Sequence, residues 1–201
     1  MKPLAQMHGD RNRLLRIFSL INSSWGLDEA LRWYSVHGSP HASVVASAHN
    51  LLSAVPPAFG YCMLLSSSLA AMIRDKHDLP AVAVAGNLSI NGEYVFKMES
   101  PLPDPSGRGE LNLQDWRGHC WVDIGGWFVD ASIFRSAYLT QPGNILSTFF
   151  HKNFGEKKGA ICWGYNEADE IGLSYEPVEV LSEKFMHGCV AGLGKLLNQQ
   201  V

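Results

Sequence analysis

Residues 118–132 read G-H-C-W-V-D-I-G-G-W-F-V-D-A-S, and this stretch predicts a hairpin of two antiparallel strands. Runs rich in β-branched and aromatic residues flank the glycine pair 125–126, and two adjacent glycines are favoured in two-residue hairpin turns. We therefore expect strands at His119–Ile124 and Trp127–Ala131, with Ile124 opposite Trp127. A turn of this length sets the register of the whole hairpin.

The register predicts one polar and one apolar face. Trp121 lies opposite Asp130, so His119 and Asp130 share a face as diagonal neighbours, roughly 7–8 Å apart at the backbone. The other face is entirely apolar and consists of Cys120, Val122, Ile124, Trp127, Val129 and Ala131. Asp123 also lies on the polar face, but it is about 13 Å along the strand from His119. Asp130 is therefore the expected partner of the histidine.

A cysteine opens the strongest helical pattern of the chain. Residues 59–65 read F-G-Y-C-M-L-L, and the segment from Tyr61 to Lys76 has an apolar side and no helix breaker. Cys62 falls in the first turn, where unpaired N–H groups and the helix dipole stabilise an anion by about 0.3–1 kcal/mol. A thiol ionises little at neutral pH, so a nucleophilic cysteine needs such a helix start or an adjacent imidazole. Cys62, His119 and Asp130 are the predicted catalytic residues.

The remaining elements predict an α+β fold. Helices are expected at 10–21, 27–36, 41–55 and 178–197, and further strands at 81–85, 94–98, 160–165 and 171–175. Helices first, then mostly antiparallel strands, then a closing helix are typical of this class. We expect one domain over residues 1–201, with a helical part at 1–55, a catalytic core at 56–135, and C-terminal strands and a helix at 136–201. The proline- and glycine-rich stretch 99–118 leads to His119 and is expected to be a substrate-covering loop.

The composition restricts the possible functions. The chain is 46% hydrophobic and 17% charged, with a formal net charge of −3, and it has no Lys/Arg cluster, so we expect no nucleic-acid partner. The first 16 residues carry charges where a signal peptide needs apolar residues, and prolines interrupt the uncharged stretch 33–73. We therefore expect a cytoplasmic protein without a membrane span. Its four cysteines are then expected to be free thiols, and the histidine spacing indicates no metal or other cofactor.

The motifs resemble those of the transglutaminase-like superfamily of cysteine enzymes. In that family a Cys at a helix start is followed by a His in an H-x-W-like strand and by an Asp on the next strand after a Gly-Trp turn. G-Y-C at Cys62 and H-C-W-V-D-I-G-G-W-F-V-D fit this pattern, and the match covers about residues 56 to 135. Tyr61 replaces the Gln of animal transglutaminases, and the R-G-G-x-C signature of the related arylamine acetyltransferases is absent. The resemblance implies a papain/transglutaminase-like fold, with the Cys helix packed on a mainly antiparallel sheet that carries His and Asp.

The expected activity is acyl transfer on an amide or ester bond, and hydrolysis is favoured over cross-linking. Cys62 is the expected nucleophile, His119 its base and Asp130 the orienting carboxylate, with substrate contacts at Tyr61 and Trp121. The expected partner is a peptide or a small amide or ester substrate. Two alternatives are a non-catalytic binding module of the same fold and a protease that processes leader peptides. Each residue also has a structural interpretation, as a packing thiol, a core histidine and a helix cap.

Overall fold

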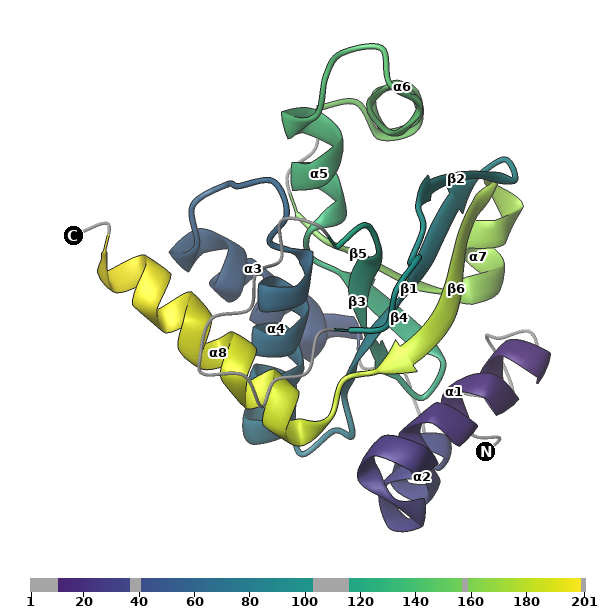
Figure 1. Cartoon of the computed structure of the whole chain (residues 1–201), viewed down its shortest axis with the longest axis vertical. Helices are drawn as coiled ribbons and strands as arrows, with labels where there is room; N and C mark the ends of the chain where they lie inside the picture. Colours follow the sequence, from purple (N-terminus) through teal and green to yellow (C-terminus); the bar gives the residue numbers. More distant parts are fainter. Residues whose placement is uncertain (1–10, 37–40, 103–115, 157–158, 200–201) are drawn as a thin grey trace.

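Helices cover both faces of a six-stranded sheet in the computed structural model of the chain (Figure 1). The structure describes residues 11–36, 41–102, 116–156 and 159–199. All of the strand pairings are antiparallel within these ranges. The arrangement confirms the α+β class that the sequence predicts.

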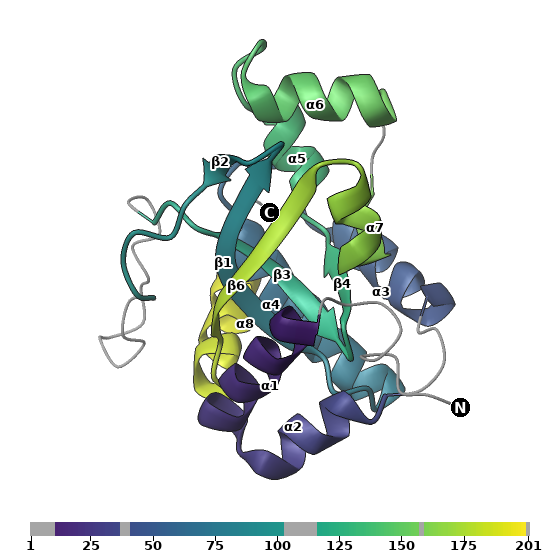
Figure 2. The same cartoon turned by 90° about the vertical axis from the view of Figure 1, so that its right-hand side faces the viewer.

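The elements follow one another in a simple order. The helices are α1 (Arg11–Trp25), α2 (Leu27–Tyr34), α3 (His41–Ala54), α4 (Cys62–His77), α5 (Ile133–Leu139), α6 (Ile145–Phe154), α7 (Tyr165–Glu170) and α8 (Glu183–Asn198). The strands are β1 (Val82–Ile90), β2 (Glu93–Phe96), β3 (His119–Ile124), β4 (Trp127–Asp130), β5 (Ile161–Gly164) and β6 (Leu173–Val180). The strand order is β2-β1-β3-β4-β5. β6 runs along the other edge of β1, because Val84 is paired with both β3 and β6 (Figure 2).

The sheet separates two apolar cores. On one face, α3, α4 and α8 pack against Cys120, Val122 and Ile124 of β3. On the other face, α1, α2, α5, α6 and α7 pack around Trp121 and Phe128. Figure 1 shows α4 and α8 on one side of the sheet and α1 and α2 on the other. Because side chains alternate along a strand, the predicted apolar face of the hairpin becomes the α4 side.

The hairpin forms in the predicted register. Both turn glycines have positive φ, 61° at Gly125 and 89° at Gly126, as a primed two-residue turn requires. Ile124 lies opposite Trp127, and Val122 lies opposite Val129. The register prediction is therefore confirmed.

α4 begins at the predicted cysteine and is buried on nearly all sides. The first helical hydrogen bond runs from the N–H of Leu65 to the carbonyl of Tyr61 (2.9 Å). α4 packs against α3, α8, β1 and β3, so consecutive residues from Cys62 to Ala70 are all buried. None of the helices in the described part of the chain has both the length and the apolar composition required to cross a bilayer.

Several predicted boundaries are wrong, mainly in the C-terminal part. β6 continues to Val180, and α8 begins at Glu183 rather than at residue 178. The Ser182 hydroxyl accepts a hydrogen bond from the N–H of Phe185 (3.3 Å) and fixes this later start. Pro177 lies within β6 next to a shift in the β1–β6 register, a position where a strand tolerates proline. α5, α6 and α7 are not among the predicted helices, and β1 is longer than expected.

Gly86 lets β1 and β6 approach each other beside the predicted histidine. It pairs with His119 on one side and with Pro177 on the other. A Cβ at this position would lie 2.1 Å from the backbone carbonyl oxygen of Glu176 and 2.9 Å from the ring of Trp121. Glycine is therefore required here by the close approach of another backbone.

Candidate active site

His119 and Asp130 form a buried pair at the ends of two strands. His119 begins β3 and Asp130 ends β4. The imidazole Nε2 lies 2.5 Å from Asp130 Oδ2, and neither residue has exposed surface. The structure thus joins the two residues that the hairpin register made diagonal neighbours.

The two oxygens of Asp130 have different partners. Oδ1 accepts hydrogen bonds from the N–H groups of Ser132 (2.9 Å) and Ile133 (3.0 Å) and from the Ser132 hydroxyl (2.9 Å). Because Ile133 begins α5, this oxygen caps the helix. Oδ2 accepts from His119 and from the Tyr175 hydroxyl, the latter at 2.9 Å. Asp130 is therefore both a helix cap and the partner of the histidine.

Cys62 is the second side chain that interacts with the imidazole. The thiol contributes to the raised pKa of His119, and Nε2 already faces Asp130, so we infer that Cys62 lies on the Nδ1 side of the ring. Nδ1 is buried and makes no hydrogen bond of regular geometry with the described residues. The interaction of Cys62 with the ring is therefore not a regular hydrogen bond.

The environment favours an imidazolium ion at His119. Burial alone would lower the pKa of His119, but the charge and hydrogen bond of Asp130, with a smaller contribution from Cys62, raise it to about 10. Burial would conversely raise the pKa of Asp130, but the charge and hydrogen bond of His119 and the donors from Ser132 lower it below its usual range. The two side chains therefore form an ion pair at neutral pH.

Cys62 reaches the histidine from the opposite side of the sheet. Cys62 is 8% exposed and belongs to the core on the α4 side, whereas His119 shares its face with Trp121 in the other core. The two can interact because each is the first residue of its element, α4 and β3. The position of the Cys62 end of α4 relative to His119 could not be predicted from the hairpin sequence alone.

The other three cysteines are buried thiols. Burial raises the pKa of Cys162 to about 12 and that of Cys189 to about 11, and it raises that of Cys120 well above its usual value. Cys120 lies on the face away from His119, as the register predicts. All four cysteines are free thiols.

Asp123 belongs to a separate hydrogen-bond network. Its Oδ1 accepts from the indole N–H of Trp33 (2.6 Å) and from the N–H of Gly126 (3.1 Å). Its Oδ2 accepts from the Tyr165 hydroxyl (2.7 Å). Burial raises the pKa of Asp123 to about 6. This carboxylate joins α2 and α7 to the hairpin turn and has no part in the His119 pair.

Trp121 supports the histidine from within the core. It has no exposed surface, and its indole N–H donates to the Tyr165 hydroxyl (2.9 Å). Its ring stacks at 6.3 Å from that of His119. In this arrangement Trp121 packs behind the site, and the structure assigns it no surface for a substrate contact.

Tyr61 has a different position from Trp121. It precedes α4 as its N-cap, is partly exposed and packs against the core that contains Cys62. This position suits the substrate contact that the sequence predicts, and the contact itself stays a prediction. The centre of the predicted substrate-covering loop, residues 103–115, lies outside the described residues.

Sequence reasoning missed two aromatic residues that enclose the imidazole. The Phe96 ring stacks on His119 with centroids 4.9 Å apart and an interplanar angle of 17°. Tyr175 is completely buried and donates to Asp130 from β6. Both come from strands outside the hairpin, and their sequence pattern signals only a buried strand position. Their contacts could not be predicted without the sheet order.

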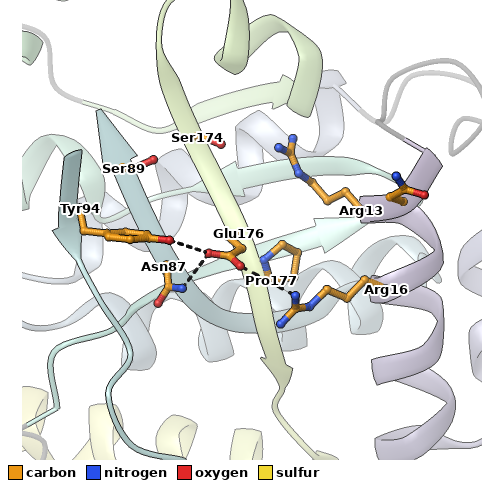
Figure 3. Close-up of a pocket in the computed structure, with 9 residues that line it drawn as sticks. Arg13, Arg16, Asn87, Ser89, Tyr94, Ser174, Glu176 and Pro177 are labelled. Carbon is orange, nitrogen blue, oxygen red and sulfur yellow. Dashed lines mark hydrogen bonds and ion pairs between the residues drawn. The ribbon is translucent and has the colours of Figure 1, made fainter. Parts of the chain in front are cut away.

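A polar pocket lies away from this site, between α1 and the strands β1, β2 and β6 (Figure 3). Its main carboxylate, Glu176, accepts from the amide of Asn87 (2.8 Å) and the hydroxyl of Tyr94 (3.3 Å), and it lies 3.8 Å from Arg16. None of the predicted catalytic residues lines it. Glu176 pairs with Arg16, and Arg13 pairs with Asp169 outside the lining (2.9 Å).

Comparisons of the chain with protein-family models, with curated proteins and with solved structures found no match. Within the described ranges, no three or more His, Cys, Asp and Glu side chains gather in a group that could hold a metal ion. The chemistry of the site therefore has to be argued from its own geometry.

Proposed function

We propose that this chain is a cysteine-dependent acyl-transfer enzyme of the transglutaminase-like superfamily, acting on an amide or ester bond. The observation that carries the proposal is the buried His119–Asp130 pair, whose imidazole pKa is raised further by the neighbouring Cys62 thiol. A histidine used only for packing gains nothing from an ionised partner, and burying the two charges is costly. Beside a thiol, the imidazolium stabilises the thiolate that acts as the nucleophile.

In the first step Cys62 attacks the substrate carbonyl. The thiol proton has already passed to Nδ1 of His119 in the resting thiolate–imidazolium pair, so the Cys62 thiolate bonds to the carbonyl carbon and the carbonyl electron pair moves to oxygen. Asp130 stabilises the imidazolium through Nε2 and keeps Nδ1 turned to the sulfur. The raised pKa of His119 favours this protonated form at neutral pH.

The start of α4 supports the charge that develops on the carbonyl oxygen. The first N–H groups of a helix have no partner within the helix, and the backbone N–H of Cys62 is one of them. Such a fixed donor, aimed at the oxyanion, is a large source of rate enhancement in acyl transfer. The Cys62 N–H is therefore the proposed first oxyanion donor.

In the second step the intermediate collapses to a thioester. The proton on Nδ1 of His119 goes to the departing amine or alcohol, and the carbon–nitrogen or carbon–oxygen bond breaks. Water then attacks the thioester, gives its proton to His119 and releases the acid and free Cys62. Hydrolysis is favoured over cross-linking because Tyr61 replaces the Gln of animal transglutaminases. A peptide or a small amide or ester is the proposed substrate.

An acylation assay with activated esters tests this proposal without a known substrate. Wild-type protein is mixed with p-nitrophenyl esters of short acids, and intact mass detects an acyl adduct that peptide mapping places on Cys62. Cys62→Ala removes the adduct, His119→Ala nearly does so, and Cys189→Ala serves as the matched buried-thiol control. Burial keeps Cys189 protonated at neutral pH, so its loss leaves acylation unchanged.

A thiol-labelling experiment separates an enzyme from a non-catalytic binding module of the same fold. Iodoacetamide near pH 6 reacts slowly with ordinary thiols, whose pKa is about 8.5. We expect Cys62 to be labelled ahead of Cys120, Cys162 and Cys189. If folded protein shows no preference for Cys62 and forms no acyl adduct, the enzyme proposal is wrong and the binding module is favoured.

A further inference from the structure

Tyr175 contributes a hydrogen bond that the proposed mechanism does not yet use. Its hydroxyl donates to Asp130 Oδ2 at 2.9 Å, the same oxygen that His119 Nε2 approaches at 2.5 Å. Tyr175 lies on β6, 45 residues from Asp130 in the chain, and has no exposed surface. A phenylalanine would fill the same core without the cost of burying a hydroxyl group. The position of the hydroxyl therefore calls for a role at Asp130.

The ring of Tyr175 is held firmly by its neighbours. Its centroid lies 4.3 Å from that of Phe128 and 5.1 Å from that of Trp121, which it meets edge to face. Burial and the nearby charge of Asp130 raise the pKa of Tyr175 well above its usual value, so the hydroxyl stays a donor over the working pH range. A fixed, permanently protonated donor thus faces the carboxylate.

We infer that Tyr175 is a positioning residue of this site, whose hydroxyl keeps the Asp130 carboxylate ionised and turned to His119. With three donors at Oδ1 and two at Oδ2, the carboxylate can neither rotate nor take the imidazole proton readily. The inference rests on the proposed function, because the orientation of Asp130 matters for catalysis only if His119 serves Cys62.

The groups around Asp130 make a pH profile informative. The titratable side chains that act on it or its partners are His119 and Cys120 of β3, Cys62 of α4, Cys189 of α8, Tyr175 of β6 and Tyr165 of α7; burial raises the pKa of Cys189 to about 11. Burial raises the pKa values of Cys120 and Tyr165 well above their usual range, so both stay neutral below about pH 8. The pH at which Cys62 labelling falls off on the acid side, its acid limb, then depends on the protonation of Asp130 and of the Cys62–His119 pair.

The decisive variant is Tyr175→Phe, and Tyr165→Phe is its matched control. The Tyr165 hydroxyl donates to a carboxylate of the same hairpin, Asp123, at 2.7 Å and is equally buried. The rate of iodoacetamide labelling at Cys62 is measured from about pH 4 to pH 9. Loss of one donor to a charged carboxylate moves the acid limb of Tyr175→Phe upward by about one pH unit or more. Tyr165→Phe retains the wild-type profile.

The outcomes separate this inference from the proposed function. If wild-type Cys62 shows no enhanced reactivity at low pH, the proposed function fails and the inference with it. If the wild type shows it but Tyr175→Phe has the same profile, or Tyr165→Phe moves as far, only the role of Tyr175 is overturned. If Tyr175→Phe does not fold, wild-type proton NMR decides. A slowly exchanging Tyr175 hydroxyl proton with a cross-peak to the His119 ring supports the inference, and its absence overturns it.

Discussion

Replacing Asp130 with asparagine tests which imidazole nitrogen serves as the base. The N–H groups of Ser132 and Ile133 both point at Oδ1, so the amide NH₂ of an asparagine cannot take that place without facing two donors. The amide oxygen therefore stays at the helix cap, and the NH₂ group faces His119 Nε2. Nε2 must then accept a hydrogen bond, which moves the imidazole proton to Nδ1. The nitrogen that faces Cys62 becomes a donor and cannot take the thiol proton.

The expected loss is large because Asp130 supplies most of the stabilisation of the imidazolium. The pKa of His119 is about 10 in the intact site, against an ordinary value of 6.5, and this difference corresponds to about 5 kcal/mol. In Asp130→Asn only burial and Cys62 remain, so the pKa of His119 falls by several units and the ring is neutral at pH 7. A triad that loses its carboxylate in this way loses on the order of 10⁴ in turnover.

The assay is the initial rate of Cys62 acylation by an activated ester at pH 7, followed by intact mass. Asp123→Asn is the matched control, because it changes the other buried carboxylate of the polar face, whose partners are Trp33, Gly126 and Tyr165. We expect a loss of at least 10²-fold in Asp130→Asn and a rate near wild type in Asp123→Asn. A wild-type rate in Asp130→Asn, with native circular dichroism, would refute the tautomer argument.

Three further predictions concern stability. Burial raises the pKa of Asp123 from 3.8 to about 6, so its contribution to the free energy of unfolding is complete below pH 3.8 and is lost as the pH rises through 6. Denaturant unfolding at pH 4 and pH 7 should show that Asp123→Asn removes a pH dependence of about 3 kcal/mol. Gly86→Ala should lower the free energy of unfolding by more than about 3 kcal/mol, because its Cβ would lie 2.1 Å from the carbonyl oxygen of Glu176. Gly194→Ala in α8 is the control, since a Cβ there meets open space, and it should be neutral or stabilising. Equal melting temperatures for the two variants would contradict this prediction. Arg135 donates to three carbonyls at the end of α3, so Arg135→Ala should lower the free energy of unfolding by about 1–2 kcal/mol, and Arg135→Lys should recover only part of it. An unchanged melting temperature in Arg135→Ala would refute this prediction.

The local parts of this structure follow from the sequence. The glycine pair 125–126 accepts the positive φ angles of a two-residue turn, and the two-residue period then places His119 and Asp130 on one face. The helix start at Cys62 follows from an unbroken apolar pattern after Gly60. These features depend on backbone preferences within about 15 residues, so no distant contact is needed to predict them.

The tertiary structure decided which partners these residues have. Asp123 lies on the same face of β3 as His119, yet it accepts hydrogen bonds from Trp33 and Tyr165, which lie in helices 90 and 42 residues away in the chain. Trp121 was expected at the substrate, and the packing of α7 and β6 buried it instead. Boundaries near Pro177 were also set by pairing with a distant strand, β1.

The assembly of the site itself depends on the sheet order. Cys62 belongs to the core on the α4 side and His119 shares the other face of β3 with Trp121, yet the thiol acts on the imidazole, and each is the first residue of its element. Tyr175 reaches Asp130 because β6 runs along β1, with Gly86 permitting the close approach. Such contacts are selected by the burial of apolar surface over the whole chain, which a local pattern of residue types does not encode. The sequence determined the residue types and faces of the site, and the packing of distant strands decided how each polar atom is used.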